Sequence, residues 1–131
     1  MTSEGPKPDR KAVQLLEERG ETSRFIDAEI KENGDLVVSA QDVGKAPLQW
    51  WGDSDYEFWA TVASKDKPLV LQALIEFINQ EGGPPPIESK DQDKALLVLL
   101  ERIYAGHFSA VDEFEDFLRS RGIPFSGGTW A

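Results

Sequence analysis

Acidic residues between positions 53 and 57 come nearest to a catalytic or metal-binding pattern in this sequence. Asp53, Asp55 and Glu57 recur at every second position of GDSDYE, and clustered carboxylate oxygens are the ligands of hard cations such as Ca²⁺. The segment lacks the downstream spacing and the terminal glutamate of the calcium-binding EF-hand loop. A turn explains Asp53, and strand alternation explains Asp55 and Glu57. No metal site is therefore predicted here.

The tryptophans around this acidic segment indicate recognition, because exposed tryptophans are frequent hot spots of protein interfaces. In the strand register derived below, Trp59 shares with Phe25 and Val37 the sheet face that lies away from the helices. Trp50 and Trp51 lie close by in the chain. We predict an interaction surface that combines these apolar residues with the acidic ones: Phe25, Val37, Trp50, Trp51, Asp53, Asp55, Glu57 and Trp59.

A second acidic group, called here the acidic helix patch, consists of Asp112, Glu113, Glu115 and Asp116 in DEFED. All four fall in the first turns of an expected helix, where the helix dipole favours negative charge. A capped, solvated helix face accounts for them. The alternative is that they bind a basic partner.

The remaining polar residues show no catalytic apparatus. His107 is the single histidine, so a catalytic or metal site there would need partners from elsewhere in the chain. We interpret it as a capping or surface histidine. There is no cysteine, no phosphate-binding glycine loop and no nucleophile elbow. No catalytic residue, metal or cofactor is predicted, and the lack of these motifs favours a protein that is not an enzyme.

Length and charge restrict the class of protein. The 131 residues match one domain with one core. A formal net charge of -10 repels phosphate backbones and anionic lipids, so direct nucleic-acid or membrane binding is not expected. The charge serves solubility or attraction to a basic partner. The lack of cysteine and of an apolar leader favours a cytoplasmic location.

Residues 1–8 are expected to form a flexible N-terminal tail, and residues 9–131 a single domain. A helix is predicted from Asp9 to Gly20, with Asp9 as its cap and an apolar group at Ala12, Val13, Leu15 and Leu16.

The stretch from Arg24 to Gln41 predicts a β-hairpin, because apolar and polar residues alternate on both sides of Asn33-Gly34. A two-residue loop would place Ile26 opposite Gln41 and mix the two faces. A three-residue loop, Glu32 to Gly34, aligns the apolar residues in three pairs: Ile30 with Leu36, Ala28 with Val38 and Ile26 with Ala40. We predict a type I turn with Gly34 in the left-handed conformation.

Further elements follow in a segregated order. A third strand is expected over residues 55–63, with Tyr56, Phe58, Ala60 and Val62 on its apolar face. Three helices follow: one after Pro68 that ends at Gly82-Gly83, one that begins with a capping box of Ser89 and Gln92, and one from Ser109 to Gly122.

Residues 123–131 either add an edge strand or lie across the core. If Phe125 and Trp130 fold over the outer sheet face, they cover part of the predicted interaction surface. The order of elements predicts an α+β fold: a three-stranded antiparallel sheet, four-stranded with such an edge strand, and α-helices packed on one face.

The segments GDLVVSAQDVG, WWGDSDYEFWATV and DEFEDFLRSRGIPF resemble those of a family of small uncharacterised bacterial proteins, over about residues 24 to 124. The resemblance implies a bacterial, cytosolic context and transfers no catalytic residue.

Two hypotheses of function follow. The first is a non-enzymatic protein-interaction module, in one version an acidic immunity- or inhibitor-like protein that binds a basic partner. The alternative is a small-ligand-binding domain, or a minor enzyme, with a pocket near Trp50 and Trp51. The oligomeric state is left open.

Overall fold

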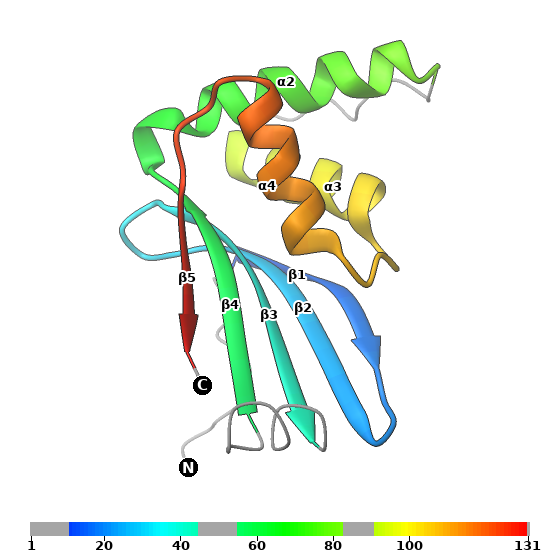
Figure 1. Cartoon of the computed structure of the whole chain (residues 1–131). Coiled ribbons are helices and arrows are strands. Elements are labelled where there is room, and N and C mark those ends of the chain that lie inside the picture. Colours follow the sequence, from blue (N-terminus) through cyan, green and yellow to red (C-terminus); the bar gives the residue numbers. More distant parts are fainter. Residues whose placement is uncertain (1–10, 45–54, 83–90, 131) are drawn as a thin grey trace.

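The computed structural model describes residues 11–44, 55–82 and 91–130. In these residues five strands form an antiparallel sheet in the order β1-β2-β3-β4-β5, and three helices cover one face of it (Figure 1). The α+β class and the helices on one face are confirmed, whereas three or four strands were predicted. The predicted N-terminal tail lies outside the described residues. In chain order the elements are β1 (Lys11–Glu18), β2 (Thr22–Ile30), β3 (Leu36–Gly44), β4 (Asp55–Val62), a 3₁₀ turn η1 (Ser64–Asp66), α2 (Lys67–Gln80), α3 (Gln92–Tyr104), α4 (Ala110–Ser120) and β5 (Ser126–Trp130).

The helix predicted after Asp9 is wrong, because this part of the chain forms the edge strand β1. β1 pairs with β2, and the register shifts between Gln14 and Leu16. Leu15 is therefore an extra residue in a β-bulge, and its side chain is buried. Val13 and Leu16, on either side of the bulge, both pack against the core. The bulge breaks the two-residue alternation of a strand and produces a spacing that resembles the helical period.

The predicted hairpin between β2 and β3 is confirmed in its register. The Gly34 N–H donates a 2.8 Å hydrogen bond to the Lys31 carbonyl, and Gly34 has a φ of 92°. A glycine adopts this left-handed conformation without steric cost. The apolar residues pair as predicted: Ile30 with Leu36, Ala28 with Val38 and Ile26 with Ala40.

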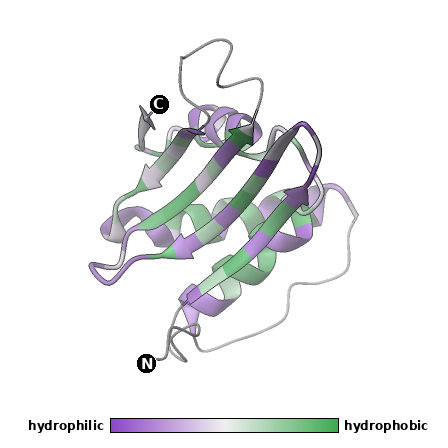
Figure 2. Ribbon diagram, turned by 90° about the horizontal axis from the view of Figure 1, so that it is seen from below, coloured by the Kyte–Doolittle hydropathy of each residue, from purple (hydrophilic) through white to green (hydrophobic). Residues whose placement is uncertain are grey.

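The core lies between the inner face of the sheet and the helices. Along β4, Ala60 and Val62 are fully buried and face the helices, as the alternation predicts. Hydrophobic and hydrophilic residues alternate along the central strands in Figure 2, so each strand contributes one apolar side. The largest fully buried side chain is Phe114 of α4, which makes an edge-to-face contact with Tyr104 at a centroid distance of 6.0 Å. This contact joins α4 to the end of α3.

The helix ends agree with the predictions except at the start of α3. Its N-cap is Asp91, whose side chain accepts a hydrogen bond from the Lys94 N–H, in place of the predicted Ser89. Ser89 itself lies outside the described residues. Pro68 stands in the first turn of α2, and Gly122 follows α4 with a φ of 66°. The chain then turns back toward the sheet.

The last described residues form the edge strand β5, which was one of the two predicted alternatives. β5 pairs with β4, with Trp59 opposite Gly128 and Glu57 opposite Trp130. It therefore extends the sheet beyond β4, and two strands separate it from Phe25 in β2. In Figure 1, β5 runs along one side of the molecule, next to β4.

Candidate functional site

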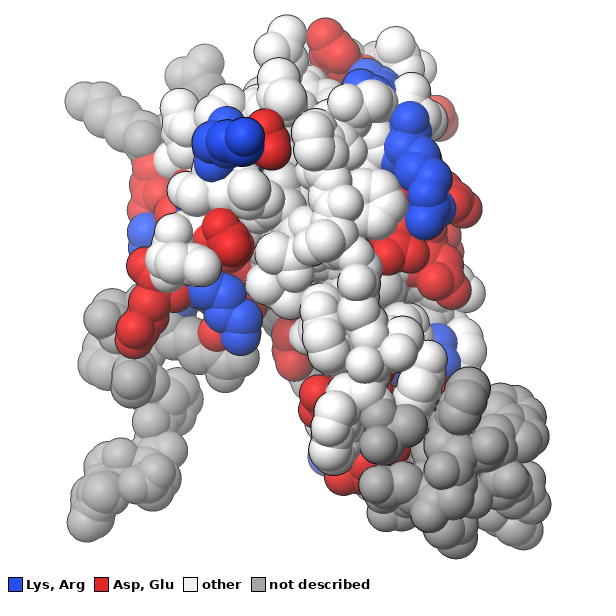
Figure 3. Space-filling model, turned by 60° about the vertical axis from the view of Figure 1, so that its left-hand side comes forward, with Lys and Arg blue, Asp and Glu red and all other residues white. Residues whose placement is uncertain are grey.

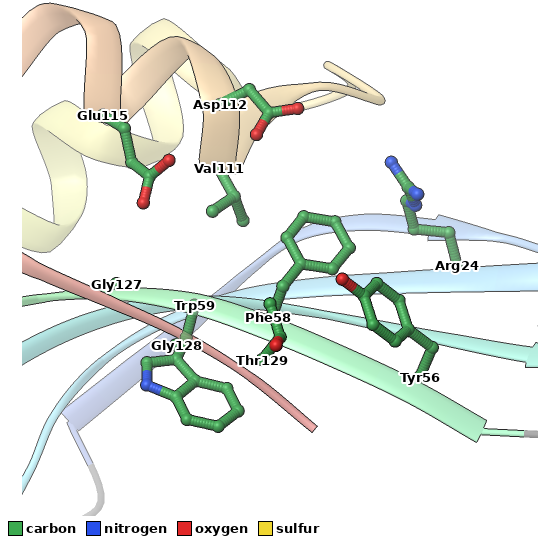
Figure 4. A pocket seen from close by; sticks show the side chains of 10 residues that line it. All are labelled: Arg24, Tyr56, Phe58, Trp59, Val111, Asp112, Glu115, Gly127, Gly128 and Thr129. Carbon is green, nitrogen blue, oxygen red and sulfur yellow. The ribbon is translucent and has the colours of Figure 1, made fainter. Parts of the chain in front are cut away.

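A cleft of about 600 Å³ lies between α4 and the strands β4 and β5. Its lining includes two members of the acidic helix patch and also Trp59 of the predicted interaction surface, although the Trp59 indole projects to the other side of the sheet (Figure 4). The lining residues come from β2, β4, α4 and β5: Arg24, Tyr56, Phe58, Trp59, Val111, Asp112, Glu115, Gly127, Gly128 and Thr129.

The upper wall of the cleft in Figure 4 is formed by α4. Asp112 is exposed, whereas the side chain of Glu115 is only 19% exposed. The Glu115 carboxylate lies over the backbone of β5, because a Cβ atom built on Gly127 would be 2.9 Å from its Oε2. Glycine at this position therefore leaves room for a carboxylate above the strand.

The electrostatic surroundings of Glu115 disfavour its charged form. Burial raises the pKa of this carboxyl; the Arg119 guanidinium opposes that effect, and the charges of Asp112 and Asp116 add to it. Arg119 Nη2 lies 4.0 Å from Glu115 Oε1, at the outer limit of an ion pair. The net result is a raised pKa, so a cation in the cleft would stabilise the ionised carboxylate.

Aromatic rings of β4 form the opposite wall. Tyr56 and Phe58 project from the helix-facing side of the strand, with ring centroids 5.6 Å apart. The faces of such rings carry partial negative charge and attract cations. The cleft thus has carboxylates on one side and aromatic rings on the other, and the Phe58 ring also contacts the Arg24 guanidinium.

Arg24 closes one end of the cleft and is itself held by several groups. Its Nε and Nη2 each donate a 2.6 Å hydrogen bond to Asp42, and its Nη1 donates a 2.9 Å bond to the Phe108 carbonyl. Its guanidinium carbon lies 3.8 Å from the Phe108 ring centroid and 5.1 Å from that of Phe58. This arginine links β2 and β3 to the loop before α4.

Arg24, Tyr56 and Phe58 were missed as site residues, although their positions follow from the predicted register. The pairing that aligns Ile26 with Ala40, carried one step further, places Arg24 opposite Asp42, as observed. The signal was therefore present in the hairpin register. The register does not indicate that α4 approaches these residues.

The predicted interaction surface does not form one apolar row. On the outer face, Phe25 pairs with Gln41 and Trp59 pairs with Ser39, so a polar residue of β3 lies beside each ring. Val37 belongs to a different row of the sheet. The Trp59 indole points away from α4, to the opposite side of the sheet from Phe58, and lies against β5 (Figure 4).

The other members of that surface fall partly outside the described residues. Trp50, Trp51 and Asp53 lie outside the described residues, as does the predicted pocket beside the two tryptophans. Asp55 and Glu57 are partly exposed on β4.

The acidic helix patch divides between two cavities. Asp112 and Glu115 line the cleft above, whereas Glu113 and Asp116 line a second cavity of about 560 Å³ among α2, α3 and α4. Apolar side chains dominate this second cavity, which is lined by Phe77, Ile78, Glu81, Arg102, Ile103, Tyr104, His107, Glu113, Asp116, Phe117 and Ser120. The patch therefore contributes carboxylates to two cavities, one on each side of α4.

His107 is a surface side chain at the rim of the second cavity, in agreement with its interpretation from the sequence. Its Nδ1 lies 2.9 Å from Glu113 Oε1, and both side chains are 45% exposed. Burial raises the pKa of the neighbouring Tyr104 hydroxyl, and the charge of Glu113 raises it further. This phenol is held in its neutral form.

Within the described ranges, no three acidic or histidine side chains are grouped closely enough to hold a metal ion. The described helices include none with the length and apolar character needed to cross a bilayer.

Comparison of the chain with protein-family models, curated proteins and solved structures found no match.

Proposed function

We propose that this chain is a non-enzymatic protein-interaction module that receives an arginine or lysine side chain of a basic partner in the cleft between α4 and β4-β5. It would act in the bacterial cytoplasm as an acidic, immunity- or inhibitor-like binder. The observation that carries the proposal is the placement of Glu115 and Asp112 opposite Tyr56 and Phe58 in one cleft. Carboxylates and aromatic faces together match a cationic group.

The electrostatics of the cleft support a cationic occupant. Glu115 is partly buried, has a raised pKa and lies 4.0 Å from Arg119. Arg24 makes three structural hydrogen bonds, two to Asp42 and one to the Phe108 carbonyl. A partner's guanidinium would supply Glu115 with the charge-assisted hydrogen bond that its position favours.

The net charge of the chain also favours a basic partner, because it acts over longer distances than the cleft does. At -10, the field of the whole protein attracts a cationic surface and increases the association rate at low salt. The cleft then provides specificity at short range. Binding is expected to weaken as salt is added, because counterions screen the attraction.

A titration with a blocked arginine tests the proposal. N-acetyl-arginine methylamide is added to ¹⁵N-labelled protein, with the neutral analogue N-acetyl-citrulline methylamide as the ligand control. We expect saturable chemical-shift changes of amides in α4 and β5 with the arginine ligand and none with the citrulline ligand. The Glu115→Gln variant is expected to bind the arginine ligand more weakly. Glu101→Gln, which removes the same charge from an exposed position on α3, is the matched protein control. Equal binding of arginine and citrulline would contradict the proposal.

Small-ligand binding is a second candidate function, favoured by the largely apolar cavity of about 560 Å³ among the three helices. Phe77 and Phe117 meet edge to face at its wall, with centroids 5.8 Å apart. A ligand at a hundred times its dissociation constant should stabilise the fold by about 2.7 kcal/mol. A thermal-shift screen of apolar metabolites would detect this, and Ile103→Asp, at the partly buried wall of the cavity, should abolish the shift.

A further inference from the structure

The two edges of the sheet differ in how they are protected against pairing with another chain. Edge strands present unpaired N–H and C=O groups, and native proteins commonly protect them with bulges, charges or covering elements. β1 has all three: a bulge at Leu15, charged side chains at Lys11, Glu17 and Glu18, and contacts with α3. The Leu15 carbonyl also accepts a 2.8 Å hydrogen bond from the Gly106 N–H.

β5 has none of these protections in the part of the chain that the structure describes. Its sequence, SGGTW, contains no charge, no proline and no bulge, and four of its five residues are exposed. It pairs with β4 on one side, and no described strand lies on the other. Figure 3, which brings this side forward, shows a band of uncharged residues with charged residues on both flanks. The edge is accessible and regular enough to pair.

We propose that β5 accepts an extended segment of the basic partner as an added sixth strand. This inference rests on the proposed function and specifies its binding mode. Main-chain hydrogen bonds to the β5 edge would supply affinity, and alternate side chains of the added strand would supply specificity. The partner segment is expected to alternate basic and apolar residues.

The two glycines of β5 allow side chains of neighbouring elements to lie over the strand, the Glu115 carboxylate over Gly127 and the Trp59 ring over Gly128. Directly opposed residues of adjacent strands have Cβ atoms about 4.5–5.5 Å apart. A residue of the added strand beside Gly127 would lie next to the position over which the Glu115 carboxylate is placed. An arginine or lysine there can reach Glu115 and the rest of the cleft, whereas the alternate residues would lie on the outer face beside Gly128 and Trp130.

Charge favours a basic partner over a second copy of this chain. Two copies that paired through β5 would bring two domains of formal charge -10 together, and they would place each Glu115 near the other copy. Like charges oppose this association. A cationic segment is attracted by the same field.

The test uses the whole chain and a defined probe, the acetylated and amidated octapeptide Val-Arg-Val-Arg-Val-Arg-Val-Arg. Amide hydrogen exchange of β5 is measured with and without about 1 mM peptide. We expect alternate β5 amides to exchange at least tenfold more slowly. A block-ordered peptide of four valines and four arginines has the same charge without alternation. Two further versions carry backbone N-methyl groups on all odd or all even residues.

Each outcome bears on the proposal separately. Strand addition predicts that one N-methylated version binds at least tenfold more weakly, and that the block-ordered peptide leaves the β5 amides unprotected. Absence of β5 protection by the alternating peptide, or equal binding of both N-methylated versions, would overturn it. If binding still depends on Glu115→Gln in that case, the cationic cleft survives and only strand addition fails.

The opposite pattern of results distinguishes strand addition from the cationic cleft. Protection of β5 that is lost on N-methylation and unaffected by Glu115→Gln would support strand addition and refute the cationic cleft. Concentration-dependent protection without any peptide, together with a dimer in analytical ultracentrifugation, would identify the occupant as a second copy and overturn the proposed partner.

Discussion

The indole ring of Trp59 lies against the backbone of Gly128 in the neighbouring strand. A Cβ atom built on Gly128 would be 2.6 Å from Cε2 and Cζ2 of that ring. Covering a strand glycine with an aromatic ring from the adjacent strand compensates for the missing side chain. Trp59 was predicted as a contact for a partner, and the structure gives it a further role in holding β5 against β4.

Gly128→Ala is expected to lower the free energy of unfolding by about 1–3 kcal/mol, because the ring must move to admit the methyl group. Gly127→Ala is the matched control: its Cβ meets the end of the flexible Glu115 side chain at 2.9 Å, and we expect a cost below about 1 kcal/mol. Urea unfolding measures both. If Gly128→Ala costs the same in a Trp59→Ala background, the ring contact is not the cause.

Gly34→Ala is expected to be more destabilising than the same change at Gly122. Both glycines have positive φ, 92° and 66°, which costs about 1–2 kcal/mol for any other residue. A Cβ atom at Gly34 would also be 2.6 Å from Ser64 Oγ, whereas one at Gly122 would meet nothing within 4 Å. The difference in unfolding free energy therefore reports the contact with Ser64 together with the φ of 92°, which lies beyond the left-handed region of other residues. Equal losses would show that backbone conformation alone makes Gly34 necessary.

Arg24→Lys tests whether this arginine holds the loop before α4. Lysine keeps the charge but loses the two-pronged bond to Asp42 and the stacking on Phe108. We expect a loss of about 1–3 kcal/mol in unfolding free energy. Arg19→Lys, at a pair with Glu17 whose arginine is 70% exposed, should change it by less than about 0.5 kcal/mol. Similar values for both variants would argue against a positioning role for Arg24.

The hairpin could be predicted in detail because its information is local. Alternation and Gly34 determine the register between β2 and β3, and the same register explains the Arg24 and Asp42 pair. β1 was misassigned because the bulge at Leu15 disguises its period, and short β5 contains two glycines, which weaken any strand signal. The cleft could not be predicted, since it depends on how α4 crosses strands that are distant in sequence.

Glu115→Gln is expected to stabilise the free protein while weakening its binding of arginine. Because the folded-state pKa of Glu115 is raised above its ordinary value of 4.5, the native state binds more protons than the unfolded chain between these two pKa values. The contribution of this residue to stability therefore falls as pH rises through that window. At pH 7 the glutamine variant should be more stable than the wild type, by less than about 1 kcal/mol.

Thermal unfolding of the two proteins from pH 4 to pH 7 measures this difference, with Glu101→Gln as the control for net charge. The stability gap should be smallest at the acidic end and should widen toward neutrality. A gap that is independent of pH would contradict the raised pKa. If the gap widens and the variant also loses arginine binding, then Glu115 carries its charge at a cost to the fold, as residues retained for binding commonly do. A variant that is more stable than the wild type and still binds arginine would contradict the proposed role of the Glu115 carboxylate in cation binding.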